Sequence, residues 1–415
     1  MNILLIHQMF LEKDDGGGSR FNEMTRIWGE MGHQVTVLGG MVHYNTGVKR
    51  DKYKGKFVVI EKDFEKNVDV VRCHVSESYN VSFLGRLWGY FSFVFSSTYA
   101  GLFKTRKKYD VILVTSPPLF VGISALILSF FKRVSYIFEV RDLWPESAID
   151  TGVLTNPTII KMAYWFEKVI YRRAKLINVL TPAFREKLLQ DKGVPAEKLI
   201  FIPNAADFSL SDELLNTFDR KTFRQNLGID DKVVIIYVGA HGVANHLIQV
   251  IEAAELLKND APQVLFLLIG DGMQKPMLKE ETQKRGLSNV LFIDSVSKAE
   301  VFKYILASDF GSSILKKVDT FKTVYSNKTF DYMACKKPMF MLIDGVSREL
   351  VEEAKCGVYV EPENPEAFAA TIKQYLSYEQ AEIDAQGQSG YDFAKANFDR
   401  DALARKYVHY LEALK

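Results

Sequence analysis

The sequence of 415 residues is poor in cysteine, and its three cysteines are far apart. Cys73, Cys335 and Cys356 have neither the C-x-x-C spacing of a redox motif nor the spacing of a zinc site. We therefore expect reduced thiols in a reducing compartment and no bound metal. The chain begins directly with a predicted strand and lacks the basic segment and cleavage site of a secretory signal, so we expect a cytoplasmic protein.

An excess of one charge is also missing. The chain has 53 Lys and Arg residues against 51 Asp and Glu residues, which gives no indication of nucleic-acid binding. There is no internal repeat and no low-complexity tract. The chain is too long for one ordinary hydrophobic core, so two domains are expected.

Short apolar runs alternate with helical patterns along the whole chain. Many of these runs are almost continuously apolar, as in parallel strands that are buried on both faces. The pattern predicts two doubly wound α/β domains. The strands are expected at 2–8, 34–40, 68–75, 109–116, 133–140 and 174–181, and then at 232–240, 263–272, 289–295, 308–315, 337–343 and 357–362.

The sequence places the domain boundary at the segment that follows Pro203. Pro203 and the Asn-Ala-Ala-Asp after it are typical of a linker. We expect a first domain over 1–205 and a second over 206–390. A break near Gly387–Gly390 is expected to precede a final helix, about 391–415, that packs back on the first domain.

Three consecutive glycines, Gly16, Gly17 and Gly18, lie between the first predicted strand and a helical pattern that begins at Arg20. A glycine-rich loop that leads into a helix N-terminus is suited to an anion such as a diphosphate. The alternative is a surface loop. The motif is not G-x-G-x-x-G, and no acidic residue ends the strand at 34–40, which argues against a NAD(P) enzyme.

The segment "SNKTFDYMACKKP" predicts a second anion site. Ser326 or Asn327 can cap a helix that begins at about Lys328, with Asp331 on the same helix face. A lysine at the positive end of a helix is unfavourable unless an anion lies there too. The alternative is a surface Lys–Asp pair that contributes less than about 1 kcal/mol.

The segment 83–103 is almost long enough to span a bilayer, and Lys104, Arg106, Lys107 and Lys108 follow it. Spanning conflicts with the predicted sheet, because strands before and after the segment belong to the same sheet. Two alternatives remain open, namely burial in the first domain and a helix that lies in the plane of an anionic membrane surface.

Several motifs occur together in one order: the glycine-rich loop, "TSPPLFVG", "FEVRDLWPES", "FIPNAADF", "YVGAHG", "LIGDG" and "SNKTFDYMACKKP". In these motifs the chain resembles the bacterial glycosyltransferases of family 4 over essentially its whole length. The most similar branch is the one described as N-acetylfucosaminyltransferase-like, which builds O-antigen and colanic acid. The resemblance implies the GT-B fold, with two Rossmann-like domains that face each other across a cleft.

The resemblance also implies a set of site residues. Lys328 is expected to bind a donor phosphate, and Asp331 the ribose hydroxyls. Asp142 and Glu139 are expected to orient the acceptor hydroxyl, and Arg141 to act only through its charge, because it cannot serve as a base. The alternative for this stretch is salt bridging at a strand end and packing of Trp144. The remaining donor-binding residues are expected to be Gly16, Gly17, Gly18, Gly239, His241, Gly242, Gly270, Asp271, Val324, Tyr325 and Asn327.

Two positions depart from the family pattern. Thr323 stands where an acidic residue usually contacts the donor sugar, so backbone N–H groups near Val324 and Tyr325 are expected to replace it. Arg141 stands where many members have a histidine. These departures leave open a scaffold protein with the GT-B fold but without activity, and a sugar-nucleotide epimerase is a further alternative.

The implied reaction is the transfer of a sugar, expected to be an N-acetylated deoxyhexose, from a UDP-linked donor. The implied acceptor is a polyprenyl-diphosphate-linked glycan, and the configuration at the anomeric carbon is retained. The enzyme would work on the inner face of the cytoplasmic membrane as a peripheral protein. No metal or other cofactor is expected.

Overall fold

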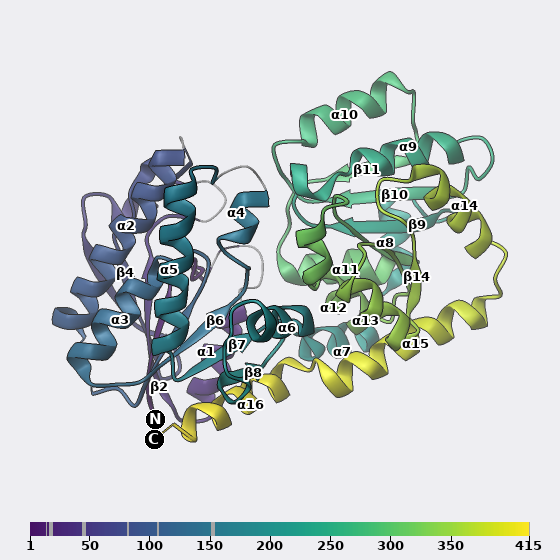
Figure 1. Ribbon diagram of the computed structural model, residues 1–415. Helices are drawn as coiled ribbons and strands as arrows, with labels where there is room; N and C mark the ends of the chain where they lie inside the picture. The colour runs from purple at the N-terminus through teal and green to yellow at the C-terminus, as the bar shows by residue number, and fades with distance from the viewer. Residues whose placement is uncertain are drawn as a thin grey trace. The chain divides into compact units, whose positions relative to one another are not determined.

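The computed structural model describes residues 1–13, 15, 20–43, 47–80, 83–105, 108–150 and 154–414 (Figure 1). The chain divides into two compact units. Unit 1 comprises Met1–Pro203 and Asp401–Lys415, and unit 2 comprises Asn204–Arg400. Each unit is built around its own parallel sheet.

The sheet of unit 1 has eight strands in the order β3-β4-β2-β1-β5-β6-β7-β8. Adjacent strands are parallel except for β3 and β4, which are antiparallel. The central strand β1 is buried on both faces, as its continuous apolar run requires. The strands are β1 (Asn2–His7), β2 (Gln34–Gly40), β3 (Val58–Glu65), β4 (Val68–Cys73), β5 (Val111–Thr115), β6 (Tyr136–Val140), β7 (Leu176–Val179) and β8 (Leu199–Phe201).

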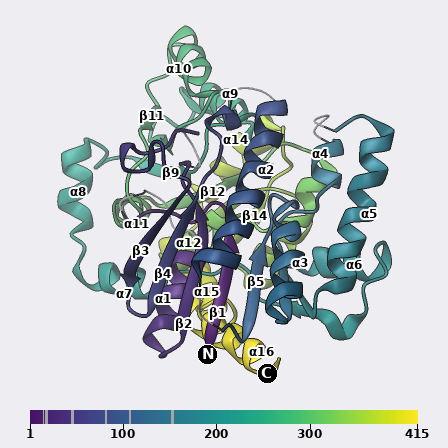
Figure 2. The ribbon, with the colours of Figure 1, turned by 90° about the vertical axis from the view of Figure 1, so that its left-hand side faces the viewer.

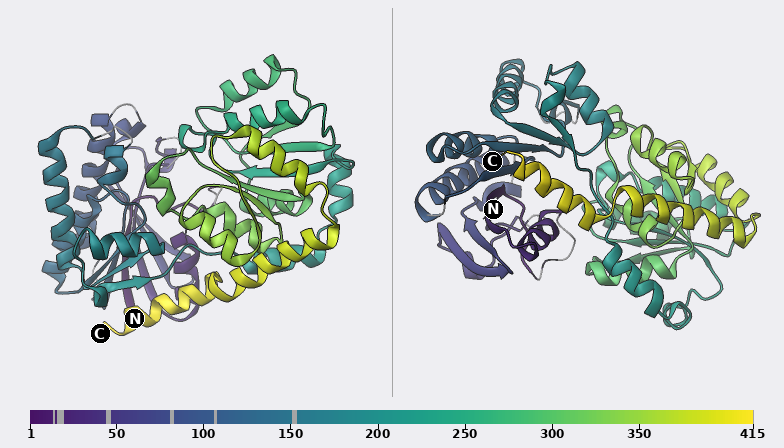
Figure 3. Two further views of the ribbon diagram at one scale, coloured as in Figure 1. Left: turned by 45° about the vertical axis from the view of Figure 1, so that its right-hand side comes forward. Right: turned by 90° about the horizontal axis from the view of Figure 1, so that it is seen from below.

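Helices α2, α3 and α5 lie side by side on one face of this sheet (Figure 2), and α3 contacts both of the others. On α1, Trp28 donates a hydrogen bond of 2.9 Å to the carbonyl oxygen of Ala404 on α16, so both chain ends lie in unit 1 (Figure 3). The helices are α1 (Arg20–Glu30), α2 (Phe83–Tyr99), α3 (Val121–Lys132), α4 (Glu146–Asp150), α5 (Pro157–Arg173), α6 (Pro182–Gln190) and α16 (Arg400–Glu412), with the shorter η1 (Asp51–Tyr53), η2 (Glu77–Asn80), η3 (Ala100–Lys104) and η4 (Ala196–Lys198).

The sheet of unit 2 has six parallel strands in the order β11-β10-β9-β12-β13-β14. Successive residues of β9 belong to two different core clusters, with Ile236 in one and Tyr237 in the other, so both faces of the sheet are covered. The strands are β9 (Val233–Val238), β10 (Val264–Ile269), β11 (Val290–Ile293), β12 (Phe310–Ile314), β13 (Met339–Leu342) and β14 (Gly357–Tyr359).

The helices of unit 2 connect these strands in the alternating pattern that parallel pairing requires. They are α7 (Phe208–Thr217), α8 (Arg220–Leu227), α9 (Ile248–Leu257), α10 (Lys275–Lys284), α11 (Lys298–Ala307), α12 (Asn327–Ala334), α13 (Val346–Ala354), α14 (Pro365–Tyr375) and α15 (Gln380–Asn397), with the short turns η5 (Val243–Asn245) and η6 (Asp319–Thr323).

Each sheet has one point where the strand order reverses. In unit 1 this point lies between β1 and β5, and in unit 2 between β9 and β12. Loops that leave two such strands at their carboxyl ends run in opposite directions and leave a crevice in which ligands bind. The loops after β1, β9 and β12 are therefore where a site is expected.

The expected helix break near Gly387–Gly390 is wrong, because α15 continues through both glycines. A Cβ atom on Gly387 would stand 2.2 Å from the carbonyl oxygen of Lys336, and one on Gly390 would stand 2.7 Å from Cβ of Cys356. The glycines therefore allow the helix to pack closely on unit 2 rather than end. The break occurs at Phe398 and Asp399, between α15 and α16.

This close packing predicts an unusual effect of alanine. In an exposed helix, Gly→Ala raises the free energy of unfolding by about 0.5–1 kcal/mol. We expect Gly387→Ala to lower it instead, by about 1–3 kcal/mol, because a backbone oxygen cannot move aside as a flexible side chain can. Urea unfolding measures the change, with Gln388→Ala on the exposed face as the control. A Gly387→Ala protein at least as stable as wild type would contradict the packing.

Candidate active site

The loops that follow β9 and β10 are held together backbone to backbone. The amide of Gly239 donates to the carbonyl oxygen of Ile269, and the amide of His241 donates to that of Asp271, both at 2.9 Å. Gly270 has a φ of +140°, and a Cβ atom there would stand 1.9 Å from the oxygen of Gly239. Only glycine fits at this contact. The structure thus brings together four of the residues expected to bind the donor, and Gly242 continues the first loop into η5.

Lys328 lies against this pair of loops. Its ammonium stands 4.6 Å from the centre of the Tyr237 ring, and a Cβ atom on Gly239 would stand 3.6 Å from Nζ. No carboxylate among the described residues forms an ion pair with it. Burial lowers the pKa of Lys328 to about 8. A desolvated cation beside two glycine loops at the switch point is suited to an anionic ligand.

The segment that leads into α12 supplies a backbone donor. Ser326 is the N-cap residue, but its side chain makes no capping hydrogen bond. Asn327 is exposed. The amide of Val324 donates to Phe321 O at 3.4 Å, whereas no acceptor for the amide of Tyr325 lies in the described part of the chain. Of the two amides expected to replace the acidic residue, Tyr325 is therefore the better placed.

Asp331 lies one turn further along α12 and is half-buried. No hydrogen-bond donor to its carboxylate is found in the described ranges. Burial raises the pKa of Asp331 to about 6, although the nearby Lys298 lowers it and Asp207 raises it further. Lys298 itself is paired with Asp207 at 2.7 Å. Asp331 is thus a carboxylate with free acceptor capacity, as binding of sugar hydroxyls requires.

The side chains of His241 and Asp271 are held within unit 2, His241 by burial and Asp271 by hydrogen bonds. His241 is fully buried, neither of its ring nitrogens has a hydrogen-bond partner in the described chain, and burial lowers its pKa to about 4. The Asp271 carboxylate accepts from the amide of Ser295 at 3.0 Å and from Lys275 at 2.9 Å. These bonds lower the pKa of Asp271 to about 2. Both residues fix the shape of the loops, and their contact with a donor stays a prediction.

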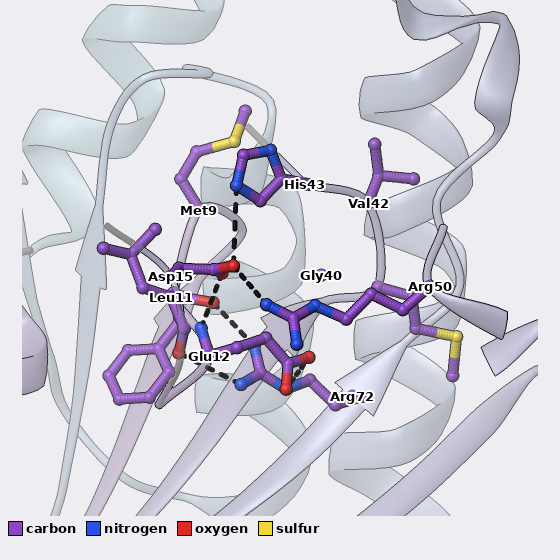
Figure 4. Close-up of a pocket in the computed structure, with 11 residues that line it drawn as sticks. Met9, Leu11, Glu12, Asp15, Gly40, Val42, His43, Arg50 and Arg72 are labelled. Atoms are coloured by element: carbon purple, nitrogen blue, oxygen red, sulfur yellow. Dashed lines mark hydrogen bonds and ion pairs between the residues drawn. The ribbon is translucent and has the colours of Figure 1, made fainter. Parts of the chain in front are cut away.

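In unit 1, Gly16, Gly17 and Gly18 lie outside the described residues, but the residue that precedes them is described. Figure 4 shows Asp15 pointing toward His43 and Arg50 among the side chains that line a small pocket. Its carboxylate pairs with Arg50, lies 3.5 Å from Nε2 of His43 and accepts from the amide of Glu12 at 2.9 Å. The start of the glycine segment is therefore fixed by a buried carboxylate.

Arg20 fixes the other end. Its guanidinium donates to Glu139 at 3.1 Å and to the carbonyl oxygens of Ile202, at 2.6 Å, and Pro203. Glu139 also accepts from Asn178 at 2.8 Å, and its side chain is 0% exposed. An acceptor hydroxyl cannot reach a carboxylate that is sealed in this way. We therefore correct the expected role of Glu139, which is to hold Arg20.

Asp142 lies just beyond β6 and is only half-buried. Its carboxylate accepts a hydrogen bond of 2.8 Å from the hydroxyl of Ser147. Burial is the main cause that raises its pKa. Arg141 is also half-buried, and its charge, after burial, lowers the pKa of His7. Asp142 is thus partly accessible to solvent, and the expected roles of Asp142 and Arg141 stay predictions.

Sequence reasoning missed Tyr237 beneath Lys328 in unit 2, and it missed Arg50 beside Asp15 and the buried Arg20 in unit 1. Arg20 could have been found by the argument used for Lys328, because a cation in the first turn of a helix needs an anion nearby. Tyr237 and Arg50 left no sequence signal. Among the residues that the structure describes, no group of His, Cys, Asp and Glu side chains could hold a metal ion.

Comparison with known families assigns each part of the chain. Residues 15–205 match the glycosyl transferase 4-like domain, and residues 219–389 match the glycosyl transferases group 1. The Escherichia coli protein WcaI, named for a glycosyl transferase role in colanic acid biosynthesis, is 24% identical over 99% of both chains. WbjE of Pseudomonas aeruginosa, named as a glycosyltransferase, is 22% identical over 74% of both chains.

The fold agrees with that of solved structures. HepE of Anabaena, solved in complex with UDP and with UDP-glucose, superposes with a TM-score of 0.70 at 19% identity, over 100% of both chains. The expected pair of Rossmann-like α/β domains is thereby confirmed. Since the two family models together cover most of both units, the chain belongs to the GT-B glycosyltransferases, with a 4-like N-terminal domain and a group 1 C-terminal domain.

Proposed function

We propose that this glycosyltransferase moves an N-acetylated deoxyhexose from a UDP-linked donor to a polyprenyl-diphosphate-linked glycan, with retention of configuration. The product would be an intermediate of a bacterial surface polysaccharide. The main support for a nucleotide-sugar donor is Lys328. Its ammonium is desolvated, has no carboxylate partner in the described chain, and lies next to Gly239 at the switch point of unit 2.

Two groups of opposite charge on α12 match the two ends of such a donor. Lys328 supplies positive charge for the diphosphate, and the free acceptor capacity of Asp331 suits the ribose hydroxyls. The backbone amide of Tyr325 would donate a hydrogen bond to the donor sugar. HepE, which shares the fold, binds UDP and UDP-glucose, and this supports uridine as the base. WcaI is named for colanic acid biosynthesis, and this supports a glycan acceptor of that class.

The chemistry needs stabilisation of a leaving diphosphate rather than a protein nucleophile. The bond from the anomeric carbon to the phosphate oxygen breaks through an oxocarbenium-like state, and the acceptor oxygen bonds to the same face of the sugar. The departing phosphate oxygen takes the proton of the acceptor hydroxyl. Lys328 would stabilise the charge that grows on the phosphate. Asp142 would orient the acceptor hydroxyl, with Ser147 holding its carboxylate.

A lipid-linked acceptor requires the enzyme to work at the membrane surface. The large apolar side chains of α2 and η3 that the structure shows as exposed are Trp88, Phe95, Tyr99 and Phe103, which recur on one helix face. Tryptophan and phenylalanine on one face are typical of an interfacial helix. In the described ranges, no helix has both the length and the apolar character needed to cross a bilayer. We propose peripheral attachment to the inner face of the cytoplasmic membrane through α2.

The direct test is transfer by the purified protein from a panel of UDP-sugars to a short-chain polyprenyl-diphosphate glycan. We expect one UDP-sugar to be consumed. NMR of the product should show the same configuration at the anomeric carbon as in the donor. Turnover should survive EDTA. Nucleotide binding without transfer or donor hydrolysis would favour the inactive scaffold, and interconversion of two UDP-sugars would favour the epimerase.

Lys328 predicts how UDP affinity depends on pH. Its lowered pKa means that the ammonium is half-charged at about pH 8 and loses its charge above that pH. The affinity should be constant from about pH 6.5 to 7.5 and then fall by up to about tenfold per pH unit as the proton is lost. Calorimetry measures both this fall and the effect of Lys328→Ala, expected to weaken binding by roughly 10- to 150-fold.

Lys328→Arg is the matched control, because arginine keeps its charge at these pH values. Its UDP affinity should be flat up to pH 9. An equally steep fall in Lys328→Arg would assign the titration to another group, and a folded Lys328→Ala protein with wild-type affinity would remove Lys328 from the phosphate site.

Two isosteric changes separate structure from catalysis in unit 1. Glu139→Gln leaves the buried Arg20 without its counter-charge and should lower the free energy of unfolding by about 3–5 kcal/mol. Asp142→Asn should not lower stability, because the raised pKa of Asp142 shows that the fold disfavours its charge. It should instead lower the transfer rate by about 10²-fold.

Thermal unfolding and initial rates with the lipid-linked acceptor measure the two effects. A stable Glu139→Gln protein would mean that the Arg20 contact carries little energy. Full transfer activity in Asp142→Asn would mean that another group orients the acceptor.

A further inference from the structure

The helix between α2 and α5 has an apolar outer face. In α3, no charged residue occurs between Val121 and Phe131. Ile123, Leu126 and Ile127 are partly exposed, and Phe130 is 76% exposed. A helix on the outside of a soluble domain ordinarily turns charged residues outward. The outer side of α3 is therefore unusual for a surface in contact with water alone.

The outer face of α5 is apolar as well. Its inner face is given by the buried residues Ala163, Glu167 and Ile170. On the opposite face Met162 is 63% exposed and Trp165 is 66% exposed, and Ile159 lies one turn before Met162. The sequence analysis considered membrane contact only for 83–103, so α5 adds a second exposed apolar face.

The ionisable side chains of these helices have one sign. From Phe83 to Lys104, over α3 and over α5, the only acidic residue is Glu167, which is buried and bound to Lys192 at 2.7 Å. The basic residues of the same segments are Arg86, Lys104, Lys132, Lys161, Lys168, Arg172 and Arg173. Apolar stripes bordered only by cations are suited to an anionic lipid surface.

The three helices form one firmly packed layer. Phe120, which precedes α3, has its ring 4.9 Å from that of Phe91 on α2 and 6.2 Å from that of Phe166 on α5. A Cβ atom on Gly122 would stand 2.4 Å from the side chain of Ile170, so α3 and α5 approach closely. Trp88 and Trp165 are close in sequence to the two rings that contact Phe120. Figure 2 shows the layer face on.

We propose that α2, α3 and α5 form a single membrane-contacting surface, in which Met162 and Trp165 of α5 enter the headgroup region of an anionic bilayer beside the aromatic stripe of α2. The proposal extends the attachment through α2 and depends on it. A second copy of the chain fits less well, because two such faces would bring like charges together without acidic partners.

The test compares Met162→Ser/Trp165→Ser with Met273→Ser, which changes a residue that is 78% exposed in unit 2. Sedimentation with vesicles of phosphatidylcholine and phosphatidylglycerol measures binding. We expect the α5 double variant to bind at least about tenfold more weakly than wild type and the Met273 variant to bind normally. Both variants should keep the thermal unfolding transitions of wild type, which shows that both units are folded.

Tryptophan fluorescence gives a second readout. Brominated lipids should quench wild type more than Trp165→Phe, because the variant lacks the tryptophan of α5 and keeps Trp28, Trp88 and Trp144. Wild-type binding by the double variant, with equal quenching of both proteins, would overturn the role of α5 and leave α2 as the sole contact. A monomer–dimer equilibrium that only the double variant loses would overturn it in favour of a second copy.

Wild type that binds no vesicle would overturn both the α5 surface and the attachment through α2. Transfer to a short-chain, water-soluble acceptor would still report whether the chain has the proposed activity. Failure of the surface and failure of the function are therefore separate results.

Discussion

The buried ion pair between Arg20 and Glu139 is the interaction on which unit 1 depends. It joins the first residue of α1 to β6 and to the carbonyl oxygens of Ile202 and Pro203, where the chain leaves the unit. Asn178 completes the network by donating to Glu139 and accepting from the amide of Ile202. A buried charge without its partner is costly, so these segments can only be arranged together. The residues that flank Gly16–Ser19 inherit their positions from this pair and from Asp15.

Lys328 in unit 2 is a cation at a helix start for which the described part of the chain supplies no carboxylate partner. Arg20 and Lys328 are both cations in the first turn of a helix that follows a loop at a switch point. Arg20 has a carboxylate and two carbonyl oxygens, whereas Lys328 has, among the residues that the structure describes, the face of the Tyr237 ring and a pKa lowered by burial. Stability alone does not explain a desolvated ammonium in this state. The proposed donor diphosphate would explain it, and this contrast separates Arg20, a structural cation, from Lys328, the cation that we propose binds the donor.

The sequence was most informative where one physical requirement fixes the residue type. Strands buried on both faces need continuous apolar runs, so all twelve expected strands are present, whereas the half-exposed edge strand β3 and the short β8 were not recognised. The expectations failed where one residue type serves two purposes. Gly387 permits close packing inside a helix rather than ending it, and Glu139 pairs with a distant arginine. Such partners, 119 residues apart for Arg20 and Glu139, leave no local pattern.

The membrane surface is a case where the sequence was ambiguous in principle. A helix such as α3, apolar on all sides, has no periodicity that separates an inner from an outer face. Only the fold shows that Phe130 points outward. The fold also couples this surface to the candidate acceptor residue, since Phe120 stands 4.9 Å from Phe91 of α2 and 5.4 Å from Trp144. Trp144 lies two residues after Asp142. The proposed contact of α2 with lipid would therefore fix the height of Asp142 above the bilayer, where the proposed lipid-linked diphosphate would present its sugar.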